Sequence, residues 1–512
     1  IINTVSDIER VLKSPAETEL FLAGGECYLK NIKLAEEERR YGDKRDYTVP
    51  RPLSSSEYSE PKSRIYDEEI ILSSGFLGGI FPQVTSYFTQ SVLNELPDIL
   101  NPLFVSCNLK TSSPSMAFLY GRPYVNMTNL ENMFKTIGLN KSLYRQSFSQ
   151  QLYLKMKNHK LSKISKSYFP VTFKEIEELT GELEKSVRTV NSQNIVEKSF
   201  FEYPVRFMIV FEYLSVKLTD ALSSLLKYFA SVSDAVNAVF KTRENSIFYN
   251  KEAMELPLFI DFASPFEEVT FNIEKKTDKL KKHTAKIPFL KRRSLKIKKT
   301  VSQIHTLLDL RDRLYLTVSE FIKQTQDAMK VIADFGIRKG RFEKESDIFY
   351  MEYDEIRRIS FDSFYGDAKE LAVFRKWKEK RYEAQVVPPE IYGYDLSDTP
   401  HIAEDMILRF LDADEFAAFP VNDKSFEGEV ENNPFADDYE NKAIAAYNLP
   451  IPRLMKYKNA AGIIAENVSP FSLAAEFAVL NDIPLYAGVR YAAAFLDKRV
   501  KGEKEKIIRV RD

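Results

Sequence analysis

The chain has 512 residues, of which 44% are apolar and 13% aromatic, so it can fill several packed cores and cannot be globally disordered. Its 73 basic residues nearly balance its 74 acidic ones, and this balance disfavours a nucleic-acid-binding protein. No apolar run approaches the roughly 18 residues of a transmembrane helix, which favours a soluble protein.

Cysteine and histidine are both scarce. Cys27 and Cys107 permit one disulfide but no disulfide framework, so the sequence is compatible with a cytoplasmic or a secreted protein. The 4 histidines are few for an enzyme of this length, and none has a cysteine or another histidine at metal-ligand spacing. We therefore expect neither a metal nor a cofactor.

The first 70 residues predict a hairpin and a linker. Residues 21–33 place apolar runs on both sides of a Gly24-Gly25 turn, and residues 36–67 are rich in charge, Ser and Pro. The chain starts at Ile1 without a signal-peptide pattern, which fits either proteolytic processing or a truncated chain.

Helical periodicity dominates residues 75–385. It is clearest over residues 301–333, and Gly336 is expected to cap that helix in the left-handed conformation. Further helices are predicted over 175–188, 205–228 and 367–383, and short extended segments over 117–120 and 349–351. The basic residues of 275–299 permit contact with a membrane surface or nucleic acid, but we expect a solvated helix face.

The last part of the chain predicts a β-α-β unit. After Pro388-Pro389 the sequence becomes acidic and rich in loops. Residues 461–465 then predict a buried strand, residues 472–480 a helix capped by Ser472, and residues 483–489 a second strand. Strand, helix and strand at this spacing indicate a separate α/β domain.

This unit carries a resemblance to a known family. Residues 460–466 read AAGIIAE, residues 472–475 read SLAA, and residues 482–489 read DIPLYAGV. In order and spacing they resemble the phosphohistidine domain of the phosphoenolpyruvate synthase and rifampicin phosphotransferase family, which reads A-A-G-V-V-T-E-x-G-G-x-x-S-H-A-A and then G-I-P-A-V-V-G-V. In that family the domain swivels between two active sites.

Weaker matches follow in the family's order. Residues 80–85, 120–126 and 347–356 are similar to its L-P-G-x-V-T-P, F-x-G-R-x-Y-x-N and D-D-I-F-F-L-T-x-x-E-L segments. Residues 7–9 and 25–33 look like the end of its ATP-grasp module, most of which the chain lacks.

The resemblance implies an α+β multidomain protein with three parts. Residues 1–70 would be the ATP-grasp hairpin with a linker, and residues 71–400 a large, mainly helical domain of the substrate-binding type. Residues 401–512 would be a degenerate phosphohistidine-like swivelling domain.

The departures from the family concern phosphate chemistry. Leu473 stands where the family has its phosphate-accepting histidine, and it has no nucleophilic atom. Val468 and Ser469 replace two glycines that let the backbone approach a phosphate. Asn31 and Lys33 replace a glutamine and an arginine. The resemblance thus predicts a catalytically inactive homologue, a pseudoenzyme.

Three roles remain open for such a chain. In the first, it binds a hydrophobic small molecule or acts as a structural protein. In the second, it pairs with a separate ATP-grasp polypeptide or an active homologue. In the third, it transfers phosphate through another residue such as Ser472. Glycosylation sequons at Asn126, Asn140 and Asn467 permit a secreted protein but do not require one.

Overall fold

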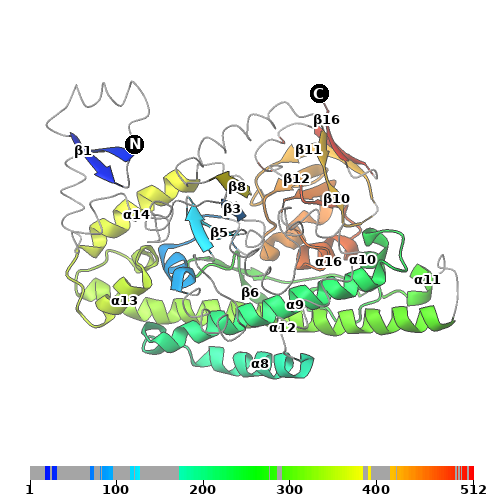
Figure 1. Cartoon of the computed structure of the whole chain (residues 1–512), viewed down its shortest axis with the longest axis horizontal. Coiled ribbons are helices and arrows are strands. Elements are labelled where there is room, and N and C mark those ends of the chain that lie inside the picture. The colour runs from blue at the N-terminus through cyan, green and yellow to red at the C-terminus, as the bar shows by residue number, and fades with distance from the viewer. Residues whose placement is uncertain are drawn as a thin grey trace.

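A computed structural model describes much of the chain, mainly from residue 172 onward. The described residues are 18–23, 26–31, 70–73, 81, 83–95, 116–119, 121–126, 172–275, 277–284, 291–383, 390–393, 415–422, 424–466, 468–489, 493, 496, 499–503 and 507–511. They form a mixed α/β structure in which a helical body adjoins a curled β-sheet (Figure 1).

Most of the helices belong to the helical body. Besides a helix over residues 87–95, the α-helices are α8 (Phe173–Ser186), α9 (Glu202–Leu225), α10 (Val232–Phe240), α11 (Leu280–Thr284), α12 (Lys291–Arg338), α13 (Tyr353–Ser360), α14 (Ala368–Glu383) and α16 (Leu473–Leu480). Short 3-10 helices are η3 (Val187–Thr189), η4 (Asn194–Val196), η5 (Lys198–Phe201), η6 (Ile247–Tyr249), η7 (Glu345–Tyr350) and η9 (Ile451–Asn459). None of the helices described combines the length and hydrophobicity needed to cross a bilayer.

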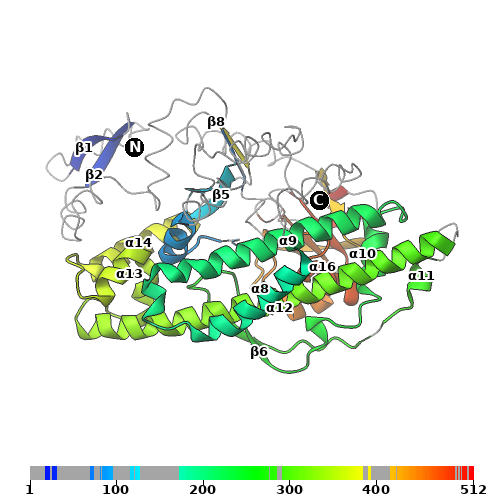
Figure 2. The same ribbon diagram turned by 60° about the horizontal axis from the view of Figure 1, so that its bottom comes forward.

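The helix α12 is the axis of the helical body. Its 48 residues extend for about 72 Å at the usual helical rise. It packs along α9 and also contacts α8, η3, η7 and α13, as Figures 1 and 2 show from two sides. The predicted helices over 175–188, 205–228, 301–333 and 367–383 correspond to α8, α9, α12 and α14.

Two local predictions in this region are wrong. The chain turns left-handed at Gly340 (φ 70°) and not at Gly336, which lies inside α12, where a Cβ atom would come within 2.5 Å of the Phe342 ring. Residues 345–350 form η7 and not a strand, because the Asp347 carboxylate accepts the backbone N–H groups of Glu343 and Lys344 and fixes a tight turn.

Small antiparallel sheets are also described outside the curled sheet. The predicted hairpin is confirmed as β1 (Thr18–Ala23) and β2 (Glu26–Asn31). A four-stranded sheet has the order β4 (Met116–Leu119), β5 (Arg122–Asn126), β3 (Ile70–Ser73) and β8 (Glu390–Gly393), and β6 (Met254–Pro257) pairs with β7 (Phe266–Val269). The pairing of β3 with β8 joins segments that are very distant in sequence.

The curled sheet has eight described strands. Their order is β10 (Phe419–Pro420), β14 (Leu485–Ala487), β13 (Gly462–Ala465), β12 (Lys442–Ala446), β11 (Phe426–Glu431), β15 (Arg499–Glu503), β16 (Ile507–Arg511) and β9 (Glu415–Ala417). The strands β11, β12, β13 and β14 are parallel, and the other pairs are antiparallel. The predicted β-α-β unit is confirmed, because α16 connects the parallel neighbours β13 and β14.

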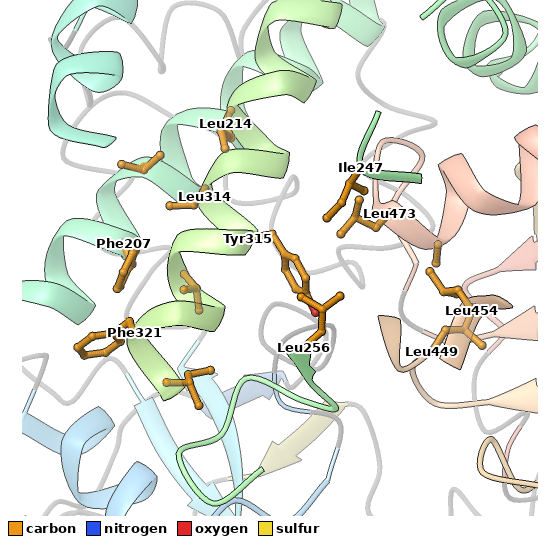
Figure 3. Packing of buried hydrophobic residues seen from close by; sticks show 14 of the residues in the cluster. Phe207, Leu214, Ile247, Leu256, Leu314, Tyr315, Phe321, Leu449, Leu454 and Leu473 are labelled. Carbon is orange, nitrogen blue, oxygen red and sulfur yellow. The ribbon is translucent and has the colours of Figure 1, made fainter. Parts of the chain in front are cut away.

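The two faces of this sheet belong to different cores. Ile463 and Leu485 belong to a large core that continues through the helical body. Figure 3 shows part of this core, where Leu449, Leu454 and Leu473 lie beside the helical body. Ile464 and Tyr486, next to them in sequence, point into a smaller core inside the curl of the sheet. Alternate residues of a strand face opposite sides of the sheet. One face of the curled sheet therefore packs against helices, and the other face is buried inside the curl of the sheet itself.

The smaller core depends on glycines at the sheet's surface, and this gives a stability prediction. A Cβ atom on Gly462 would lie 2.6 Å from two carbons of the buried Phe426 ring. Gly462→Ala should therefore lower the free energy of unfolding by about 1–3 kcal/mol, as measured by urea denaturation. Gly181→Ala in α8 is the control, because no atom lies within 4 Å of the added methyl group and alanine favours helix by about 0.5–1 kcal/mol. Equal stabilities for the two variants would contradict this packing.

Candidate functional site

The candidate site lies at the N-terminus of α16, beyond the carboxyl end of β13. Ligands of open α/β sheets bind at such ends. Ser472 is the N-cap of α16, and its hydroxyl oxygen accepts the backbone N–H of Ala475 at 3.1 Å, as predicted. Leu473 follows as the first helical residue and is only 5% exposed. Figure 3 shows its side chain close to Ile247 of the helical body.

Of the other predicted site residues, Val468 and Ser469 adjoin the candidate site, whereas Asn31 lies in a different part of the fold. Val468 is buried in the large core, and Ser469 is exposed, its backbone oxygen accepting the N–H of Ser472 at 3.1 Å. Asn31 is the last residue of β2 and pairs with Thr18. The sheet of β1 and β2 is separate from the curled sheet to which α16 is connected.

For the remaining predicted residues the structure gives at most a position and does not test their roles. Asn126 ends β5, while Lys33, Asn140 and Asn467 lie outside the described residues. Cys27 pairs with Leu22 in the first hairpin, and Cys107 also lies outside the described residues.

Directly behind the N-terminus of α16 is a buried charge cluster that the sequence analysis missed. Glu476 is 0% exposed, and both of its carboxylate oxygens accept from Nη1 of Arg243, at 2.8 and 2.9 Å. Nη2 of Arg243 donates to Asp309 at 2.7 Å and to Asp312 at 3.0 Å. Arg311 also donates to Glu476 and to Asp312. Two arginines thus join three carboxylates from the helical body and α16.

The same cluster holds main-chain groups on both sides. Arg311 donates to the carbonyl oxygen of Phe471 at 2.6 Å, directly before α16. Asp312 accepts the backbone N–H of Ile247, the residue close to Leu473, at 3.1 Å. Charged groups with several hydrogen bonds in a low-dielectric interior fix geometry strongly. The cluster therefore sets the position of the α16 N-terminus relative to the helical body.

Further contacts around this cluster join the two parts of the molecule, which are the helical body and the curled sheet with α16. The rings of Phe240 and Phe471 lie 5.9 Å apart between centroids, and those of Phe248 and Phe477 also 5.9 Å. At the far end of α16, Asp482 accepts from Lys241 of the helical body at 2.9 Å. This interface is thus both apolar and charged.

Burial and charge act on the ionisable groups of the cluster. Burial alone would lower the pKa of Arg243, but Glu476 and then the aspartates raise it above its usual range, so Arg243 stays charged. Burial lowers the pKa of His305, whose Nε2 lies 2.9 Å from the carbonyl oxygen of Val239 and must donate to it. Burial raises the pKa of the nearby Tyr249 hydroxyl. The cluster is therefore ionic, and burial favours the neutral form of the nearby His305.

The cluster stabilises the contact between α16 and the helical body but supplies no group suited to phosphoryl transfer. Leu473 has no nucleophilic atom, and among the described residues the Ser472 hydroxyl is bonded as a helix cap and not to a general base. In the part of the chain that the structure describes, no group of three or more His, Cys, Asp or Glu side chains could hold a metal ion.

A signal for the cluster is present in the sequence. Glu476 is the single charged residue of α16, whose other residues are apolar. Asp312 interrupts the apolar stripe of α12 between Leu308 and Tyr315. A lone charge on a buried face requires a partner of opposite sign. Each of these two positions therefore indicates that a cationic partner exists, but not which residue it is.

The cluster predicts a large loss of stability when one partner is removed. Arg243→Met leaves Glu476 buried with a single arginine, so the free energy of unfolding should fall by about 3–5 kcal/mol. Lys330→Met removes the exposed ion pair with Asp327 on α12 and should cost at most about 1 kcal/mol. Urea denaturation compares the two, and similar midpoints would mean that the buried cluster does not join the two parts.

His305 predicts a pH dependence. Because burial lowers its pKa in the folded state, the unfolded chain binds more protons below the ordinary pKa of about 6.5. The free energy of unfolding should therefore decrease as the pH is lowered from about 7.5 to 5.5. His305→Gln should make this decrease smaller in denaturation curves recorded across that range. An unchanged pH dependence would contradict a buried neutral imidazole.

No protein-family model matches the chain, and no curated protein matches its sequence.

Proposed function

We propose that the chain is a catalytically inactive relative of the phosphoenolpyruvate synthase and rifampicin phosphotransferase family, with a structural role. The observation that carries the proposal is the environment of Leu473. The residue at the position of the family's phosphate carrier is buried, and its helix is tied to the helical body by Arg243 and Arg311.

Phosphate transfer by a swivelling domain requires a nucleophile and freedom to move. Leu473 lacks the nucleophile. Motion would expose Glu476 and separate it from both arginines, and it would also open the continuous core between α16 and the helical body. Breaking such a buried pair costs several kcal/mol, so these contacts favour one fixed arrangement of the two parts.

A hydrophobic ligand remains a prediction for the same scaffold. Aromatic side chains gather in the helical body, with ring centroids 4.6 to 6.4 Å apart: Phe88, Phe200, Phe201, Phe207, Phe262, Phe321 and Tyr353. They contact one another at the distances of ordinary core packing. This packing favours the structural role over ligand binding, and native mass spectrometry of the purified chain would detect a retained ligand.

The proposal predicts that no acid-labile phosphate forms. The purified chain should stay unlabelled after incubation with radioactive ATP or phosphoenolpyruvate, because the position of the carrier has no imidazole. Leu473→His should also stay unlabelled, since the side chain at this position is buried against the helical body. Labelling of the unmodified chain would overturn the proposal. Labelling of the variant alone would show that the two parts separate in solution.

A further inference from the structure

The exposed side of α14 is basic and aromatic. This helix lies at the outer edge of the helical body, on the far side from the curled sheet (Figures 1 and 2). Leu371, Ala372 and Arg375 are buried beneath it. Residues three and four apart line its opposite side, which we call the basic face: Lys369, Val373, Lys376, Trp377, Lys380 and Arg381, with Glu370 and Glu383 at its margins.

The centre of the basic face is apolar and held in place. Val373 is 65% exposed and Trp377 48% exposed, one helical turn apart. The Trp377 ring stacks on Phe374 at 6.0 Å between centroids, and the guanidinium carbon of Arg381 lies 5.0 Å from the ring centroid. A large apolar side chain fixed in one position and still exposed is typical of a binding anchor.

Positive charges crowd along one side of this apolar centre. Lys344, the N-cap of η7, and to a smaller extent Lys380 lower the pKa of Lys376, whereas Asp347 raises it, so Lys376 lies in a net repulsive positive field. The whole chain is close to neutral, so the basic face is a local concentration of positive charge. An acidic partner would relieve this repulsion.

We propose that the basic face of α14 binds an acidic amphipathic helix of a partner protein. Two apolar side chains one turn apart, Val373 and Trp377, match the narrow stripe by which one helix packs on another. Acidic residues beside the partner's own stripe would pair with the flanking Lys376, Lys380 and Arg381. A bilayer surface is less suited, because it is bound by wider apolar faces. The proposal does not depend on the proposed function.

The chain contains its own probe for this test, because Trp377 is its only tryptophan. The binding probe is a synthetic helical peptide with leucines one turn apart and flanking glutamates. Adding it to the full chain should shift the Trp377 emission to shorter wavelength, as the indole loses water. The shift should saturate, weaken at high salt, and be absent with a peptide that has lysines in place of the glutamates.

Matched charge reversals locate the effect. Lys376→Glu with Lys380→Glu should weaken peptide binding about tenfold or more. Lys298→Glu with Lys299→Glu, on the exposed side of α12, makes the same change in net charge and should leave binding unchanged. The proposal is overturned by a constant emission, by equal effects of the two double variants, or by a shift seen only with vesicles of equal parts phosphatidylcholine and phosphatidylserine.

Discussion

The arrangement of the two parts of the molecule depends on the buried pair of Arg243 and Glu476. Neither side chain reaches solvent to any useful extent, so each must keep its counter-charge. The pair joins the loop after α10 to the middle of α16, and α12 supplies the other charges. Apolar contacts alone would tolerate some sliding between helices, whereas hydrogen-bonded ions do not. The continuous core around the pair then follows from this fixed placement.

This constraint connects the fold with the proposed loss of chemistry. The N-terminus of a helix is a natural site for a phosphate, because its free N–H groups point outward. At α16 the Ser472 side chain occupies one of these N–H groups, and Arg311 holds the preceding carbonyl. The end of the helix is therefore used to hold the protein together. A static scaffold is the role we propose for a site whose helix end is already engaged by the protein's own groups.

Sequence reasoning succeeded where a pattern is local. The helices α8, α9, α12 and α14 follow from their apolar periodicity, and the unit of β13, α16 and β14 follows from short apolar runs separated by turns. The cap at Ser472 also needs only its neighbours.

It failed where segments distant in sequence meet. The pairing of β3 with β8 has no local signal, because each strand is only 4 residues long and the two lie far apart in the sequence. The charge cluster was missed for the same reason. Glu476 in an apolar helix indicates a cationic partner, but only the folded structure identifies that partner as Arg243. Gly336 was misread because a glycine is equally suited to a cap and to close packing, here against Phe342.

The chain order of the charge cluster has a consequence for biosynthesis. Proteins fold largely from the amino end as they leave the ribosome. The partners Asp309 and Asp312 precede Glu476 in the chain by more than 160 residues, so Arg243 can pair with them before Glu476 has been synthesised. The aspartates can hold the arginine in its final place before the curled sheet exists. The curled sheet and α16 would then dock on a helical body that has already formed. Glu476 would complete a charge cluster whose other members are in place.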